Sequence, residues 1–481
     1  MYEQLVERYR EISALGDAAG VLRWDQEVMM PEGATPARSR QLSTLSSVQH
    51  DLLTADETER LLDGAEDESL DGRQRAAVRE IRREYERADR VPRDLVEEIS
   101  RAVSEAHPVW REARENSEFA DFEDTLADLV DLKRRYAEAI DPDRPAYEVL
   151  FEDYEPCLDL EVVDSVLGSL RSEIPGLVEG AATDVDENPL GTGHPEERQE
   201  ALAREALDYL GYDWSHGRLD VAPHPFSSGN QYDARVTTRY GDDVLDALTS
   251  TVHEFGHALY TLGLPREHYG SPLGESRDLS VHESQSRFWE NHVARSPEFW
   301  RGFAGRAEDA LDVEVDADTV AAYLNRVKPD NLIRVEADEL TYHLHIAVRF
   351  DVERRLVEGD LDVSEVPAAW NDAYDDVVGV RPQDDAEGVL QDIHWSHGSF
   401  GYFPTYSLGS VLAAQIHEAM DREVDVAARA EDGEFSPLRE WLRDEVHRHG
   451  RRYETDELVR RATGESLSAD AFLSYVGEKY G

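Results

Sequence analysis

The residues best suited to chemistry form the run HEFGH, which begins at His253 and ends at His257. Two histidines four positions apart share one face of a helix, where both imidazoles can bind one metal ion. Glu254 can then accept a proton from a water at that ion. The spacing therefore predicts a site that activates water for attack on a carbonyl, with zinc as the typical metal. Cobalt or manganese would also accept His and Glu ligands. The alternative interpretation is a pair of surface histidines on an acidic helix.

A third ligand is expected in the helix-like segment DLSVHESQSRFWENH, which follows the first motif. A carboxylate from a following helix completes the thermolysin-like set of zinc ligands, whereas the sequence has no HExxHxxGxxH pattern of the metzincin type. We therefore predict that His253, His257 and Glu283 bind one zinc ion. His282 and Glu290 in the same segment remain rival ligands.

A helix over 242–262 has to position the two histidines. Asp242 and Asp243 stand in its first turn, and apolar residues recur near a 3.6-residue period. Just upstream, residues 218–240 alternate β-branched and polar residues between Pro and Gly, which predicts a small β-sheet beside this helix. We expect the segment DARVTTRY in that sheet to form an edge strand that binds an extended substrate through its backbone.

The rest of the chain predicts packed helices, so the expected fold class is mainly α. Helical periodicity and charge pairs four positions apart extend from Tyr2 to about Ile140. Clusters of turn-forming residues mark breaks at 31–36, 141–145, 187–195 and 398–404. We expect an N-terminal helical part of about residues 1–200 and a metal-site part of about residues 201–481.

The charge balance limits the possible partners. Asp and Glu number 104 against 50 Lys and Arg, which gives a formal net charge of −54. A surface with so much negative charge repels nucleic acid, which argues against nucleic acid as a partner. The lysines are Lys133, Lys328 and Lys479 alone, and arginine supplies the other cations, a pattern that resembles haloarchaeal cytoplasmic proteins. Molar salt shortens the Debye length to roughly 3 Å. We therefore predict a halophilic fold that loosens in dilute buffer.

The sequence also predicts a cytoplasmic protein that does not enter a membrane. Its first residues mix charges and contain no apolar core of signal-peptide length. No apolar stretch approaches the roughly 20 residues that span a bilayer. The single cysteine, Cys157, cannot form an internal disulfide, and its acidic surroundings, DYEPCLDLE, disfavour a thiolate. We therefore expect an inert thiol.

Further motifs resemble the M32 family of metallocarboxypeptidases, in the order that the family has them. Besides HEFGH they are HPF at 224–226, DARVT at 233–237, HESQ at 282–285, IRVEAD at 333–338 and GVLQDIHW at 388–395. The resemblance covers nearly the whole chain. It implies one peptidase domain, 1–481, and a groove-type helical fold with zinc on the floor of a deep groove. It also implies a homodimer, and that cobalt can replace zinc in some members.

The resemblance directs attention to two arginines. A carboxypeptidase must recognise the free α-carboxylate of its substrate, and a guanidinium can pair with a carboxylate bidentately. Arg334 in IRVEAD is the first candidate, and Arg235 in DARVT is the second. The alternative for either residue is an ordinary salt bridge.

Donors for the oxyanion of the tetrahedral intermediate are expected in the segment QDIHWSHGSFGYFPTY. His394 and Tyr406 are the first candidates, Tyr402 is the next, and the segment also contains His397. The alternative for each is aromatic packing beneath the groove. His224 in HPF is either a wall residue of the same cleft or a turn histidine.

Together these residues predict a zinc carboxypeptidase that releases single C-terminal amino acids from peptides. Glu254 takes a proton from water and passes it to the departing amine. A dipeptidyl carboxypeptidase or oligopeptidase is the nearest alternative, because related groove peptidases share the metal motif and differ in where they clamp the end of the substrate. A catalytically silent peptide-binding scaffold is the alternative from another class, and the presence of Glu254 argues against it.

Overall fold

Helices dominate the structure, a computed structural model that describes residues 1–181, 185 and 187–481. The helices of the N-terminal region are α1 (Tyr2–Val28), α2 (Thr35–Leu53), α3 (Asp56–Glu66), α4 (Gly72–Arg90), α5 (Arg93–Asn116), α6 (Ala120–Ile140), α7 (Ala146–Phe151), α8 (Leu160–Ala181) and α9 (Glu196–Leu210). Those after the sheet are α10 (Val244–Gly263), α11 (Leu279–Arg287), α12 (Pro297–Leu311), α13 (Ala317–Leu324), α14 (Thr341–Glu358), α15 (Val366–Val377), α16 (Pro404–Asp421), α17 (Val426–Asp432), α18 (Ser436–Glu445), α19 (Thr455–Thr463) and α20 (Asp470–Tyr480). The predicted mainly α fold is confirmed, and the predicted breaks fall at helix ends. None of the described helices is both long and apolar enough to cross a bilayer.

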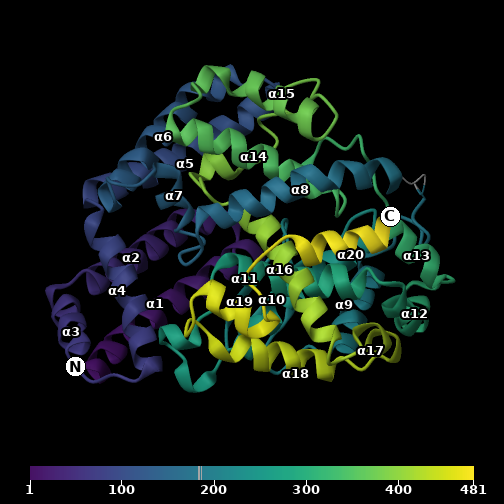
Figure 1. Cartoon of the computed structure of the whole chain (residues 1–481), viewed down its shortest axis with the longest axis horizontal. Helices are drawn as coiled ribbons and strands as arrows, with labels where there is room; N and C mark the ends of the chain where they lie inside the picture. The colour runs from purple at the N-terminus through teal and green to yellow at the C-terminus, as the bar shows by residue number, and fades with distance from the viewer. Residues whose placement is uncertain (182–184, 186) are drawn as a thin grey trace.

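The helix α10 forms where the sequence predicted it, and it runs through the middle of the molecule beside α11, which packs in turn on α16 (Figure 1). Asp243 caps its N-terminus, because its side chain accepts hydrogen bonds from the backbone N–H groups of Leu245 and Asp246. Most of its residues are buried, among them Val252 and Phe255. A helix packed on nearly all sides holds its side chains in one arrangement, which a metal site requires.

Two glycines let the helices around α10 approach closely. A Cβ added at Gly256 would lie 2.5 Å from the carbonyl oxygen of Gln285, so α10 and α11 can touch only where this side chain is absent. A Cβ added at Gly409, on α16, would lie 2.4 Å from Glu283 Cγ. The position of Glu283 is therefore set by α10 on one side and by α16 on the other.

The predicted small sheet is present, but the segment DARVTTRY does not form its edge. The strand order is β1 (Leu219–Val221), β3 (Asp233–Thr238), β2 (Ser227–Asn230), with β1 parallel and β2 antiparallel to β3. The prediction was wrong because the residues before the turn at 231–232 fold back on β3, while β1 pairs with its other side. The free edge nearest α1 belongs to β2.

Buried apolar residues form two main clusters. The larger runs from Val91 to Val476 and includes residues on both sides of the predicted division near residue 200. The smaller joins α1, α3 and α4 through residues between Leu5 and Tyr85. In Figure 1 these first helices lie together on the left of the molecule. Helices α1, α3 and α4 therefore have an apolar core of their own.

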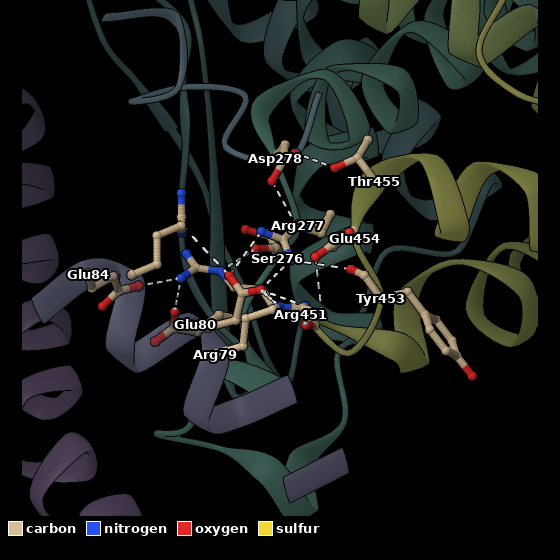
Figure 2. Close-up of polar contacts among 12 residues, drawn as sticks. Arg79, Glu80, Glu84, Ser276, Arg277, Asp278, Arg451, Tyr453, Glu454 and Thr455 are labelled. Atoms are coloured by element: carbon tan, nitrogen blue, oxygen red, sulfur yellow. Dashed lines mark hydrogen bonds and ion pairs between the residues drawn. The ribbon is translucent and has the colours of Figure 1, made fainter. Parts of the chain in front are cut away.

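A buried ion-pair network joins the N-terminal helices to the start of α11 (Figure 2). Arg277 donates to both carboxylate oxygens of Glu80 on α4, at 3.0 and 3.1 Å, and to Asp278 Oδ1 at 2.7 Å. Arg451 pairs with Glu84 Oε1 at 2.6 Å. Because Asp278 is the N-cap residue of α11, this network fixes the start of the helix that carries Glu283.

Candidate active site

The two histidines and Glu283 lie together. His253 Nε2 and His257 Nε2 on α10 are 3.7 and 3.5 Å from the same oxygen, Oε2, of Glu283 on α11. The ligand atoms of the three residues all lie within 4.8 Å of one another. Tetrahedral zinc with bonds of about 2.0–2.2 Å separates its ligand atoms by about 3.4 Å. The donor set therefore fits a divalent cation with little movement.

The two rival ligands lie outside this set and instead orient the histidines. Glu290 Oε2 is 2.9 Å from His253 Nδ1, and the carbonyl oxygen of His282 is 3.0 Å from His257 Nδ1. Each Nδ1–H therefore has an acceptor, and each Nε2 keeps its lone pair for a cation. Such contacts fix both the tautomer and the direction of the ring.

Arginines hold the two carboxylates in place. Arg287 Nε donates to Glu283 Oε1 at 2.8 Å, so the other oxygen is the one that faces the histidines. Arg295 Nη2 donates to Glu290 Oε1 at 2.6 Å. Burial alone would raise the pKa of Glu290, but Arg295 and Arg287 outweigh it and hold that pKa well below its usual value. Glu290 is therefore an ionised acceptor for His253.

Glu254 lies where a proton acceptor is needed. Its side chain is buried, and the nearby Ser227, on β2, favours its ionised form. Burial raises the pKa of Glu254 to about 7 in the metal-free protein, with Glu283 and Glu290 adding to the rise and His253 opposing it. A carboxyl with a pKa near neutrality can both take up and release a proton at neutral pH.

The tyrosine candidates gather on the side of Glu283 that α16 covers. The centres of the Tyr402 and Tyr406 rings are 5.2 Å apart. Burial is the main cause that raises the pKa of both phenols, and the negative charge of Glu283 adds to the rise. His394 Nε2 is 3.3 Å from the Tyr406 hydroxyl. Burial lowers the pKa of His394 to about 4, so at neutral pH it is a neutral imidazole.

Arg334 is buried and has partners within the protein. Its Nη2 and Nε donate to Asp392, at 2.7 Å for the closest contact, and its Nη1 donates to the Tyr342 hydroxyl at 3.0 Å. Its guanidinium also lies 5.2 Å from the centre of the Tyr406 ring. The second buried arginine at Asp392 is Arg349. The salt bridge considered as the alternative is thus present, beside the tyrosine cluster.

The remaining candidates lie elsewhere. Arg235 pairs with Asp233 of its own strand at 2.6 Å and stacks on Trp24 of α1. His224 is exposed. The ring of His397 packs against His107, on α5. Burial raises the pKa of the Cys157 thiol to about 12, as expected for an inert cysteine.

A cavity of about 480 Å³, here called the β2 cavity, opens between β2, α1 and the end of α10. Ser227, Gly229 and His282 are among the residues that line it. Thr237 donates its backbone N–H to the Phe226 carbonyl at 3.0 Å, so by antiparallel alternation the backbone groups of Ser227 and Gly229 point away from β3. Among the described residues, the β2 cavity is therefore lined by a strand edge whose backbone groups β3 does not use.

Comparison with known proteins places the chain in a family. The model of the carboxypeptidase Taq (M32) metallopeptidases matches residues 4–480. The chain is 39% identical to thermostable carboxypeptidase 1 of Thermus thermophilus, over 100% of this chain and 98% of that protein, and 34% identical to carboxypeptidase 1 of Bacillus subtilis, over 98% and 96%. The crystal structure of the M32 carboxypeptidase from Deinococcus radiodurans superposes with a TM-score of 0.96 at 36% identity, covering 100% of this chain and 98% of that one. The chain belongs to the M32 family of metallocarboxypeptidases. It is accordingly a hydrolase with a divalent metal.

The sequence analysis did not identify several residues that shape this M32 site. Gly256 was visible within HEFGH, but its purpose depends on α11, and Gly409 carried no local signal. Arg295 acts on His253 only through Glu290. A pattern within one helix does not contain such contacts between segments.

Proposed function

We propose that this metallocarboxypeptidase uses zinc, held by His253, His257 and Glu283, to release single amino acids from the C-terminus of peptides. The observation that carries the proposal is the meeting of three ligand atoms beside the buried carboxylate of Glu254. A bound zinc ion would supply Lewis acidity toward water and toward the peptide carbonyl.

The chain's own groups move the proton. Glu254 accepts a proton from the attacking water and delivers it to the departing amine. Tyr406, with Tyr402 next to it, donates its phenol to the oxyanion, and the neutral imidazole of His394 orients Tyr406.

The substrate lies between β2 and the tyrosine cluster. The backbone groups of Ser227 and Gly229 at the free edge of β2 bind the extended peptide ahead of the scissile bond. Arg334 receives the α-carboxylate, because its guanidinium lies against Tyr342 and Tyr406. To do so it shares its outer N–H groups between the substrate and its present partner Tyr342. Arg235, already paired and stacked, helps to hold β3 against α1.

Exchange of Glu254 for Gln tests the proton acceptor. We expect the E254Q protein to bind one equivalent of zinc and to lose turnover by at least about 10²-fold, the lower end of general acid–base contributions. Glu267→Gln, at an exposed glutamate after α10, is the matched control and should keep full activity. Near-normal turnover of E254Q would refute the assignment.

Product analysis tests the size of the released group. One blocked peptide is incubated with the protein in high salt and followed by mass spectrometry, before and after chelation and after zinc or cobalt is added back. Stepwise loss of single residues, stopped by chelation, is expected. Release of dipeptides would contradict the proposal and favour the dipeptidyl carboxypeptidase instead.

We propose four further properties. A single peptidase domain over 1–481 and a homodimer are supported by the family resemblance. A cytoplasmic, halophilic protein is supported by composition, with a net charge of −54 and three lysines. Light scattering in high and low salt would test the dimer.

A further inference from the structure

The wall of the β2 cavity carries more negative than positive charge. Among the described residues that line it, three carboxylates stand against a single guanidinium; the residues are Asp17, Glu84, Glu275 and Arg451. His282 also lines the cavity, but burial lowers its pKa to about 4, so it adds no charge at neutral pH. A peptide that enters the cavity therefore meets a surplus of carboxylate.

The guanidinium of Arg451 is shared between two of these carboxylates. Its Nη1 lies 2.6 Å from Glu84 Oε1 (Figure 2) and 3.0 Å from Glu275 Oε2. The side chains of Glu84 and Glu275 are 27% and 26% exposed, so both can be reached from the cavity. Burial raises the pKa of Glu275 to about 7, with the charges of Glu84 and Asp17 adding to the rise and Arg451 opposing it. One guanidinium therefore does not balance the negative charge of this wall.

The third carboxylate, Asp17 on α1, has neutral partners. Asn230 Nδ2 donates to Asp17 Oδ2 at 3.0 Å, and the Tyr269 hydroxyl donates to the same oxygen. Among the described residues, none forms an ion pair with Asp17 and none donates to its Oδ1. Asp17 lines the cavity and is partly exposed. Its Oδ1 can therefore accept a hydrogen bond from a group that enters the cavity.

A substrate that follows the edge of β2 has to pass Asp17. Only one residue follows the bond that a carboxypeptidase cleaves, so the peptide along β2 consists of residues before that bond. Ser227 begins β2 near Glu254, and Asn230 ends it at Asp17. The peptide therefore runs antiparallel to β2, with its C-terminus toward the metal ligands.

The length of β2 sets which substrate residue meets Asp17. Asn230 is three positions beyond Ser227, a distance of about 10 Å at about 3.3 Å per residue. If the residue whose carbonyl is attacked lies opposite Ser227, the residue opposite Asn230 is the fourth one counted back from the cleaved bond. A side chain at this fourth position is the one within reach of Asp17.

We propose that Asp17 makes this enzyme prefer peptides with a lysine or arginine at the fourth residue before the cleaved bond. The cationic side chain donates to Asp17 Oδ1, and the carboxylates of Glu84 and Glu275 add to the attraction. Salt screens partly buried charges much less than exposed ones, so the preference persists in high salt. The count of residues rests on the proposed function, whereas the surplus charge of the wall does not depend on it.

Cleavage of paired peptides in high salt tests the preference. Each pair carries lysine or norleucine, which has a similar chain without the ammonium, at the second, third, fourth or fifth residue before the cleaved bond. All peptides are N-acetylated, which removes the terminal ammonium as another source of positive charge. At the fourth residue, lysine is expected to raise kcat/KM at least about fivefold over norleucine, a difference of about 1 kcal/mol. Equal kcat/KM values at that residue would overturn the proposal.

Two variants of Asp17 locate the cation. Asp17→Asn keeps the size of the side chain and should lower the lysine-to-norleucine ratio below about twofold. Asp17→Lys should reverse the preference, so that glutamate at the fourth residue is cleaved faster than lysine. Glu11→Gln is the matched control, because Glu11 is exposed on the same helix, outside the lining of the cavity, and carries the same charge. A ratio that survives D17N, or that falls equally in E11Q, would overturn the assignment to Asp17.

Binding without turnover separates this inference from the proposed function. Equilibrium dialysis of the E254Q protein against the fourth-residue pair should give dissociation constants that differ by at least about fivefold in favour of lysine, and equal constants would overturn the proposal. Release of dipeptides by the unaltered protein would contradict the proposed function. The lysine preference would still be decided, because its position is counted from the cleaved bond that mass spectrometry identifies.

Discussion

Replacement of Gly409 by alanine should displace Glu283 from the metal site. A Cβ at this position would lie 2.4 Å from Glu283 Cγ and 2.5 Å from Glu283 Cβ. Non-bonded carbon atoms pack at about 3.5–4.0 Å, so about 1.1 Å of overlap has to be relieved. The crowded atoms are the base of the side chain, which cannot swing aside as a flexible end could. The shift therefore reaches the carboxylate and the backbone of α11.

A shift of this size exceeds what a metal site tolerates, since ligand distances are held within about 0.2 Å. We expect the zinc affinity of G409A to fall by at least about 10–100-fold, the loss seen when supporting contacts are disturbed. Overpacking should also lower the free energy of unfolding by about 1–3 kcal/mol. Competition with a chromogenic chelator measures the first quantity, and urea unfolding in high salt measures the second.

Gly305→Ala is the matched control, because Gly305 lies on the exposed face of α12 with no atom within 4 Å of an added Cβ. This change should raise the free energy of unfolding by about 0.5–1 kcal/mol and leave zinc affinity unchanged. If G409A binds zinc as tightly as the unaltered protein, α16 does not set the position of Glu283 and the reasoning is refuted.

Three further outcomes are expected. Glu290→Gln should weaken zinc binding by about 10–100-fold, because His253 loses its charged partner; unchanged affinity in the chelator competition would contradict this role. Burial lowers the pKa of His345 to about 3, so between about pH 3 and 6.5 the unfolded chain binds more protons than the folded chain, and the free energy of unfolding should fall as the pH decreases through this window. Urea titrations at fixed KCl measure that slope, and His345→Gln should flatten it; a slope as steep as before would exclude this histidine as a source. Finally, the melting temperature should rise between about 0.1 and 3 M KCl, as salt screens a net charge of −54, and a melting temperature indifferent to KCl would argue against a halophilic fold.

The sequence predicted what depends on spacing within one element. The i, i+4 histidines and the acidic first turn predicted α10, which begins and ends within two positions of the expected bounds. Alternating β-branched residues located the sheet. The sequence did not predict the strand order, because nothing in DARVTTRY itself indicates that β1 and β2 pair with the two sides of β3.

The partners of the charged residues were also beyond local patterns. Arg334 stands in a motif, but Asp392, which accepts from its Nε and Nη2, lies in another motif and meets it only after folding. Glu290 was considered as a ligand because of its type and position. Glu290 lies in the π-helical segment Phe288–Ala294, where its carboxylate contacts His253 Nδ1 and does not join the three metal ligands.

The separate core of the N-terminal helices has a mechanical consequence. One wall of the β2 cavity comes from α1, which shares an apolar cluster with α3 and α4, whereas α10 belongs to the larger cluster. The first helices are joined to the rest of the chain by the charged contacts around Arg277 and Arg451 and by a small apolar contact of Ala76 and Ala77 with Leu273. A rigid-body shift of α1, α3 and α4 would therefore change the width of the passage for peptide, and the contacts of Arg277 with Glu80 and Asp278 would transmit it to the start of α11. Access to the site and the position of Glu283 are thus linked through one arginine.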